Sequence, residues 1–154
     1  MLRMDYSLRV ATLGDIDVLI HHRVAMFLDM GYDGRLIEQT EIAAREYFSS
    51  AVADGSYRGW IAEAEGQIVG GAGVVISAWP GVPGSRLAKR AMILNMYVER
   101  EYRRRGIARA LIQKTIAWCK AEGFSGVGLH ASDEGRPLYE SMGFLTTNEM
   151  RLKF

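Results

Sequence analysis

The chain has 154 residues, of which 49% are hydrophobic and 24% charged, and its net charge is +1. This composition is ordinary for a folded domain, and the length supports one hydrophobic core, so we expect a single domain over residues 1–154. The small net charge argues against nucleic acid as a partner, and no apolar run approaches the ~20 residues of a membrane span. The single cysteine excludes an internal disulfide, and no residues have the spacing of metal ligands. We therefore expect a cytoplasmic domain without a metal.

The first half of the chain predicts a strand, two helices and a hairpin. Apolar and polar residues alternate over residues 6–11, which is typical of a strand. Apolar residues recur at helical spacing over 15–31 and again over 36–53, so two helices are expected. Two apolar runs within 60–76 are joined by a turn that contains glycine, which predicts a β-hairpin. The stretch 77–90 has no period and predicts a loop.

The second half predicts strands alternating with helices. Residues 91–98 are apolar at nearly every position, as in a central strand covered on both faces. Two apolar stripes over 107–119 predict a long buried helix. A short strand at 127–130, a short helix at 133–142 and a terminal strand or strand pair at 144–154 follow. The whole order indicates an α/β (α+β) fold.

The junction between the expected strand and the long helix is the most specific feature. Residues 98–108 pass from a buried strand through a charged turn directly into a helix, whose first N–H groups have no intrahelical partner and can donate to phosphate oxygens. Gly106 lets the ligand approach the backbone closely. Guanidinium groups suited to phosphates surround it, from Arg103, Arg104, Arg105 and Arg109. Composition alone leaves a second interpretation open, a solvated basic turn.

Other phosphate-binding and DNA-binding motifs fit this junction poorly. The Rossmann fingerprint needs three glycines and the Walker loop needs Gly-Lys-Ser/Thr, and neither is present here. A helix-turn-helix needs two adjacent helices, whereas strands are expected on both sides of the basic helix.

Two motifs resemble the GNAT superfamily of N-acetyltransferases. Residues 103–108, Arg-Arg-Arg-Gly-Ile-Ala, match the signature of Arg or Gln, two residues, Gly, one residue, then Gly or Ala. Residues 132–144 look like the closing helix of the family, with Tyr139 and the ending Gly143-Phe144. The resemblance covers essentially the whole chain. It implies a GNAT fold, with a central mixed, mostly antiparallel sheet of six to seven strands, a splay between the fourth and fifth strands, and about four flanking helices.

The resemblance also implies an acyl-CoA-dependent N-acyltransferase that moves acetyl from acetyl-CoA to a primary amine by direct transfer in a ternary complex. The coenzyme A pyrophosphate would be held at Arg103, Arg104, Arg105, Gly106, Ile107, Ala108 and Arg109. The pantetheine arm would pair with backbone groups of Met96 and Val98. Ser132 stands where the family often has Asn, and its hydroxyl can still donate or accept.

Tyr139 is the expected catalytic residue. Its phenol, with an ordinary pKa of ~10, can give a proton to a departing thiolate of pKa ~8.5. The alternative is a core tyrosine that packs on Phe144. The base that deprotonates the amine stays open among Glu63, Asp29, His130 and Asn95 acting through water.

The acceptor is expected to be a small-molecule or peptide amine. It would lie against an apolar wall, for which the sequence offers Met26, Phe27, Met30, Tyr32 and Trp79, although helical spacing also explains most of these residues as plain core. A non-catalytic acyl-CoA sensor and a structural module with a basic turn are the competing functions. Both a monomer and a homodimer are compatible with the sequence.

Overall fold

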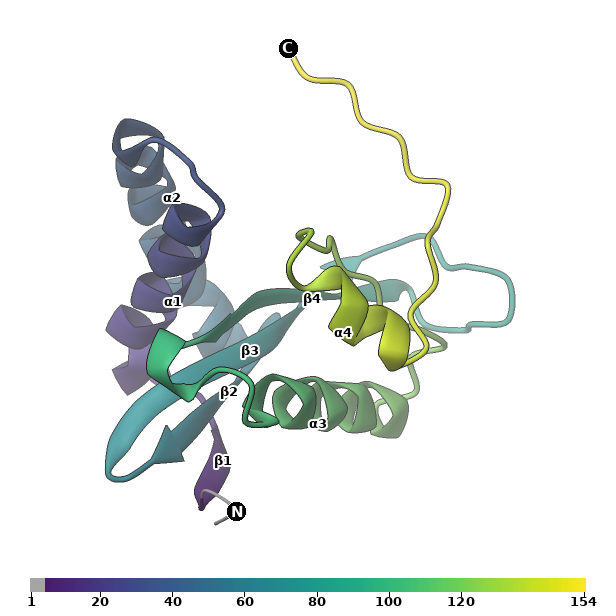
Figure 1. Cartoon of the computed structure of the whole chain (residues 1–154). Coiled ribbons are helices and arrows are strands. Elements are labelled where there is room, and N and C mark those ends of the chain that lie inside the picture. Colours follow the sequence, from purple (N-terminus) through teal and green to yellow (C-terminus); the bar gives the residue numbers. More distant parts are fainter. Residues whose placement is uncertain (1–4) are drawn as a thin grey trace.

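The computed structural model describes residues 5–154 and contains one antiparallel sheet of four strands in the order β1-β2-β3-β4. The strands are β1 (Tyr6–Val10), β2 (Tyr57–Ala64), β3 (Gln67–Ala78) and β4 (Lys89–Val98). The helices are α1 (Ile16–Asp29), α2 (Gly34–Asp54), α3 (Ile107–Ala121) and α4 (Arg136–Ser141), with short 3-10 turns η1 (Leu13–Asp15) and η2 (Arg100–Tyr102). Helices α1 and α2 cover one face of the sheet and α3 the other (Figure 1).

Apolar side chains point alternately to the two faces of the sheet, so each face has its own hydrophobic core. On β2, Trp60 and Ala62 pack with Leu111 of α3, whereas Tyr57 and Ile61 pack against the α1 and α2 side. Successive side chains of a strand point to opposite faces, so a strand that is apolar throughout is covered on both. The sheet is therefore a middle layer between two helical layers.

Most elements expected from the sequence are present with small shifts of their ends. The hairpin of β2 and β3 turns at Glu65 and Gly66, which both have positive φ angles of 53° and 74°. Two successive left-handed residues are the conformation that joins twisted antiparallel strands. The loop after β3 is shorter than expected, because Ser77 and Ala78 pair with Arg90 and Lys89 and extend the ladder.

Strand β4 differs from the expectation of a central strand covered on both faces. It is the last strand of the ladder, and on its free edge only one parallel bridge forms, from Met92 to Gly128. The burial alternates along it, with Ile93, Asn95 and Tyr97 buried and Leu94 and Met96 half-buried. One face of β4 is thus partly open.

The prediction of six to seven strands is wrong, since the described residues form four. The expected strand at 127–130 is reduced to the bridge at Gly128. The expected terminal strand at 144–154 does not form, and the segment 145–154 extends away from the body (Figure 1). Strand formation needs a partner edge, and this segment pairs with no strand among residues 5–154. No helix within residues 5–154 is long and apolar enough to cross a membrane.

Candidate active site

The turn before α3 has an unusual backbone. Arg104 has a φ angle of 63° and Gly106, which caps the helix, has a φ angle of 84°. Left-handed residues within a turn make backbone concavities that bind anions. Arginine rarely adopts this conformation without constraint, and the turn is held at its start by a hydrogen bond from the Arg103 N–H to the Arg100 carbonyl at 3.3 Å.

Helix α3 presents its amino end to the same place. Its first backbone hydrogen bond runs from the Ala110 N–H to the Gly106 carbonyl at 3.0 Å, so the amides of Ile107, Ala108 and Arg109 precede the helical ladder. A Cβ placed on Gly106 would meet no atom within 4 Å. The space in front of the cap is therefore open, as the pyrophosphate of a coenzyme requires, and the macrodipole of α3 favours an anion there.

The arginines of the turn have different surroundings. Arg103 is engaged within the protein, because its Nε donates to the Val98 carbonyl at 2.8 Å and a terminal nitrogen lies 2.5 Å from a carboxylate oxygen of Asp29. Arg109 donates to the Ser141 hydroxyl at 2.8 Å and so links α3 to α4. Arg104 is exposed and forms no ion pair within residues 5–154. Arg104 is thus available to an anion, whereas Arg103 positions the turn.

Arg105 is the remaining arginine of this turn. Its guanidinium carbon lies 5.5 Å from the centroid of the Tyr102 ring, and the residue is exposed at the start of the helix. This stacking holds the cation near the open cap.

The free edge of β4 opens next to this turn. The Glu99 N–H donates to the Val69 carbonyl of β3, and backbone groups alternate between the two edges of a strand. Val98 and Met96 therefore direct their backbone groups to the free edge. The segment around Gly128 lies next to β4. Among residues 5–154 it pairs with β4 only through the bridge between Met92 and Gly128, so the segment and β4 separate beyond this bridge. The expected splay between the fourth and fifth strands stays a prediction, because the described residues form only the fourth of these strands.

A bulge in β4 lies where the expected splay would begin. The register shifts between Gly71 and Gly73 of β3, and Asn95 there has a φ angle of 60°. The Asn95 side chain is buried, donates to the Leu19 carbonyl of α1 at 2.9 Å, and leaves its own oxygen without a partner. Bulges redirect side chains and end pairing at functional sites.

Tyr139 lies on α4 with its ring in an edge contact with Phe144, at 5.7 Å between centroids. Burial raises the pKa of Tyr139, so the phenol keeps its proton at neutral pH. Ser132 accepts a hydrogen bond from the Gly135 N–H at 3.1 Å, and a Cβ on Gly135 would lie 3.1 Å from the Tyr139 ring. Gly135 thus leaves room for the tyrosine, and Ser132 shapes the turn that begins α4.

The candidate bases are placed very differently. Asp29 pairs with Arg100 and Arg103, which lower its pKa and leave it a weak base. Glu63 of β2 forms an ion pair with Arg9 of β1, with 2.6 Å between a carboxylate oxygen and the guanidinium Nε. His130 is exposed and lies 3.0 Å from Glu149. Among these four candidate bases, only Asn95 has a buried side-chain oxygen that accepts no hydrogen bond from residues 5–154, and this oxygen lies at the bulge.

The expected acceptor wall is only partly assembled. The rings of Phe27 and Tyr32 meet edge to face at 5.3 Å and line an open cavity of about 510 Å³ between α1 and α2. Met30 is exposed beside them. Trp79 instead stacks on Arg90, whose guanidinium carbon lies 4.2 Å from a ring centroid of the indole.

Sequence analysis did not identify a second polar group beside the turn. His21 Nε2 lies 2.5 Å from a carboxylate oxygen of Glu99, and the Tyr97 hydroxyl donates to the other oxygen at 3.4 Å. His21 comes from α1, Tyr97 from the end of β4, and Glu99 from the position just after β4. The only sequence signal was the position of Glu99 directly after the strand.

Comparisons with known proteins agree with this geometry. The model of the acetyltransferase (GNAT) family matches residues 22–144. A GCN5-related N-acetyltransferase from Ralstonia eutropha has 34% sequence identity and a TM-score of 0.93, with 97% of this chain and 99% of that chain covered. A predicted acetyltransferase from Clostridium acetobutylicum, solved with acetyl-CoA, has 27% identity and a TM-score of 0.89, covering 97% of this chain and 96% of that one.

Curated relatives match over a shorter region. Human N-acetyltransferase 8 is 32% identical over 93 residues, which are 58% of this chain and 39% of that protein. The mouse protein named probable N-acetyltransferase family 8 member 5 is 33% identical over 116 residues, 72% of this chain and 47% of its own length. The chain thus spans less than half the length of these relatives. The fold is a layered α/β domain in which an open sheet edge lies beside the left-handed turn at Gly106. By the match over residues 22–144, this chain belongs to the GNAT acetyltransferase family.

Proposed function

We propose that this chain is an N-acetyltransferase that moves an acetyl group from acetyl-CoA to a primary amine by direct transfer within a ternary complex. The observation that carries the proposal is the junction of the free edge of β4 with the open turn at Gly106. An extended arm with a phosphate at its end fits these two features together. The edge offers unpaired backbone groups to the arm, and the helix cap offers amides to the phosphate.

The coenzyme-binding residues have separate tasks in this proposal. The backbone of Met96 and Val98 pairs with the pantetheine arm. The amides from Arg104 to Arg109 surround the pyrophosphate, with Gly106 giving close access and the Arg104 and Arg105 side chains adding charge. Arg103 acts as a positioning residue, because its guanidinium joins the end of β4 to Asp29 of α1. Ser132 supports the arm from the turn before α4.

The chemistry follows from a thioester and a neutral amine. The amine nitrogen attacks the thioester carbon, the C–S bond breaks, and the nitrogen loses a proton while the thiolate gains one. The Val98 N–H at the free edge is placed to donate to the carbonyl oxygen as negative charge develops. Tyr139 gives the proton to the thiolate, since its phenol stays protonated at neutral pH.

Removal of the incoming amine's proton requires an acceptor, because an amine of pKa ~10.4 is neutral in only about one molecule in 10³ at pH 7. The unpartnered oxygen of Asn95 lies at the bulge where the expected splay begins. We propose that it holds a water through which this proton leaves.

Thiol release from acetyl-CoA in the presence of a panel of primary amines tests the proposal. Tyr139→Phe should lower kcat by roughly 10- to 10³-fold with little change in acetyl-CoA affinity, since general acid catalysis contributes typically ~10²–10⁴. Unchanged turnover would remove Tyr139 from the reaction. Tight acetyl-CoA binding without thiol release from any amine would instead indicate a sensor domain.

The oligomeric state belongs to the same proposal, and of monomer and homodimer we propose the homodimer. Met150, Leu152 and Phe154 alternate along the exposed segment 145–154, with 94%, 78% and 116% of their surfaces exposed. Alternating apolar residues are the pattern of a strand that packs one face, and the edge of a second copy would give this segment a partner. Sedimentation of the full chain and of a variant ending at residue 147 distinguishes the two states.

A further inference from the structure

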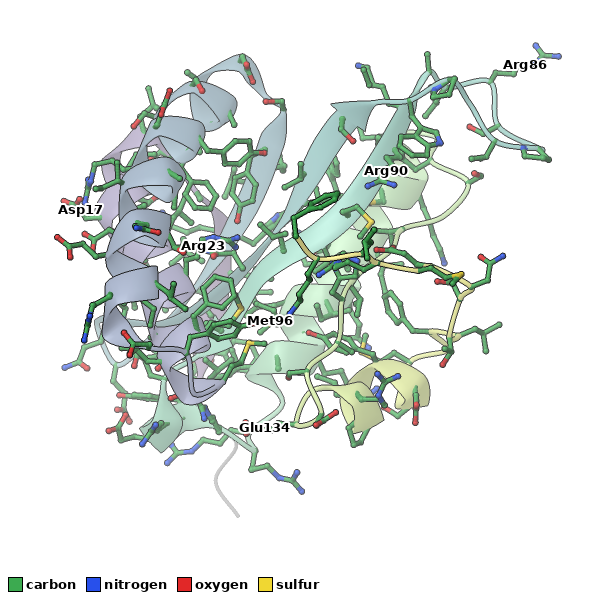
Figure 2. The ribbon with its side chains drawn as sticks, turned by 90° about the horizontal axis from the view of Figure 1, so that it is seen from above. Asp17, Arg23, Arg86, Arg90, Met96 and Glu134 are labelled. Carbon is green, nitrogen blue, oxygen red and sulfur yellow. The ribbon has the colours of Figure 1, made fainter. Side chains whose placement is uncertain are left out.

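Between α1, α2 and β2 lies a group of polar side chains that form no hydrogen bond or ion pair with residues 5–154. It consists of Arg23 of α1, Tyr47 of α2 and Tyr57 of β2, called here the Arg23 cluster. The hydroxyls of Tyr47 and Tyr57 are buried and have no hydrogen-bond partner, and their rings lie 6.4 Å apart. Arg23 forms no ion pair with any carboxylate in residues 5–154 and lies between the helical layer and the strands (Figure 2).

These groups are costly to leave unpaired. A buried polar group without a partner costs about 1–3 kcal/mol, which applies to the hydroxyls of Tyr47 and Tyr57, whereas Arg23 is half-buried. Burial lowers the pKa of Arg23, yet a guanidinium remains charged in a protein. Burial also raises the pKa of both phenols, so they stay protonated and can donate. The cluster thus combines one cation with two hydroxyl donors and contains no anion.

The fold makes room for the cluster. A Cβ on Gly73 of β3 would lie 2.1 Å from the Tyr57 hydroxyl oxygen, so only glycine admits this phenol. The charge of Asp54 raises the pKa of Tyr47, but the Asp54 carboxylate already accepts hydrogen bonds from the Ser56 N–H at 2.8 Å and from the Ser56 hydroxyl at 2.6 Å. Among residues 5–154, no acid forms an ion pair with Arg23, and Asp54 is engaged by Ser56.

The cluster also lies close to the proposed reaction site. Leu19, one helical turn before Arg23 on the same side of α1, accepts the hydrogen bond from Asn95 at the bulge. On the other side, the Arg23 guanidinium lies 5.0 Å from the centroid of the Phe27 ring, which lines the cavity between α1 and α2.

We propose that the Arg23 cluster binds a carboxylate of the acceptor, so that the acetyl acceptor is a small amine that also carries a carboxylate, as an amino acid does. This inference rests on the proposed function. A carboxylate matches the single positive charge of the cluster, and its two oxygens match the guanidinium and the phenols. The amine of the same molecule then reaches the splay, where the Asn95 bulge begins.

The test compares matched acceptors. Thiol release from acetyl-CoA is measured with amino acids and with the amides of the same amino acids. The intact protein should prefer the acid by at least 10-fold in kcat/KM. Arg23→Gln should lower kcat/KM for the acid by roughly 10- to 100-fold, the effect of losing one charged hydrogen bond, and should leave the amide unchanged. Arg45→Gln, which removes an exposed arginine paired with Asp17, serves as the control and should change neither.

Two further measurements separate the possible outcomes. N-acetyl amino acids, the expected products, should raise the Tm of the intact protein and of Tyr139→Phe but not that of Arg23→Gln. Arg23→Met, which replaces the unpaired cation with an apolar side chain, should keep the Tm of the intact protein and lose this response. Equal kcat/KM for acids and amides, or an equal loss on both in Arg23→Gln, overturns the proposal while acetyl transfer stands. If no amine releases thiol, the proposed function fails, and the Tm response to N-acetyl amino acids still decides on the carboxylate site.

Discussion

A substitution at Gly106 tests the phosphate site most directly, and Gly123 supplies a matched control. The two glycines stand at opposite ends of α3 with φ angles of 84° and 86°. A Cβ on Gly106 meets no atom within 4 Å, and one on Gly123 meets only Leu87 at 4.0 Å. Neither alanine variant clashes within the protein, so both carry the same backbone cost of about 1–2 kcal/mol.

The expected results separate stability from binding. Both Gly106→Ala and Gly123→Ala should lower the Tm by roughly 2–8 °C, since 1 kcal/mol corresponds to about 2–4 °C at this chain length. Only Gly106→Ala adds a methyl group where the pyrophosphate would approach. If one charged hydrogen bond is lost, acetyl-CoA affinity falls about 10- to 150-fold.

Calorimetric titration of acetyl-CoA, with the Tm of each variant, measures both effects. Gly123→Ala should bind acetyl-CoA as the unmodified protein does. If the two variants bind equally well, Gly106 is only a helix cap and the phosphate site is refuted. If both lose affinity in step, binding depends on the stability of α3 rather than on its open end.

Three other groups give independent tests. Burial raises the pKa of Tyr139, so the alkaline loss of kcat that depends on this residue should fall above pH 10, and a pH profile of Tyr139→Phe should lack it. Arg9 and the Thr12 amide lower the pKa of Asp15 to about 2. A carboxylate with a lowered pKa stabilises the fold above its unfolded pKa of about 4 and loses this contribution as the pH falls toward 2. Asp15→Asn should therefore cost about 2 kcal/mol at pH 7 by urea unfolding, and a deficit that persists at pH 2 would contradict the ion pair. Burial raises the pKa of the Cys119 thiol to about 11, so a disulfide reagent at pH 8 should leave the folded protein unlabelled, while rapid labelling would show that α3 opens.

The sequence predicted best what depends on neighbouring residues. The turn from β4 into α3 was identifiable because an arginine-rich stretch, a glycine and an amphipathic helix follow one another within a few residues. The φ angles of Arg104 and Gly106 give that turn its physical form. Helices α1, α2 and α3 followed from apolar spacing alone, because such a helix satisfies its own backbone.

Features that depend on distant partners were missed or overestimated. Residues 127–130 and 144–154 have strand-like side chains, but a strand exists only if another edge accepts its hydrogen bonds. Asp29 was a candidate base until its pairing with Arg100 and Arg103 was known. No sequence pattern brings Arg23, Tyr47 and Tyr57 together, because they stand on three elements separated by loops.

The extended segment 145–154 has a consequence for how stability is measured. Its apolar side chains add nothing to the core of the isolated chain, since Leu145, Met150 and Leu152 are 86%, 94% and 78% exposed. If a second copy covers them, burial occurs only on association, and the free energy of unfolding then rises with protein concentration. The midpoint of thermal unfolding would in that case be a property of the solution as well as of the chain.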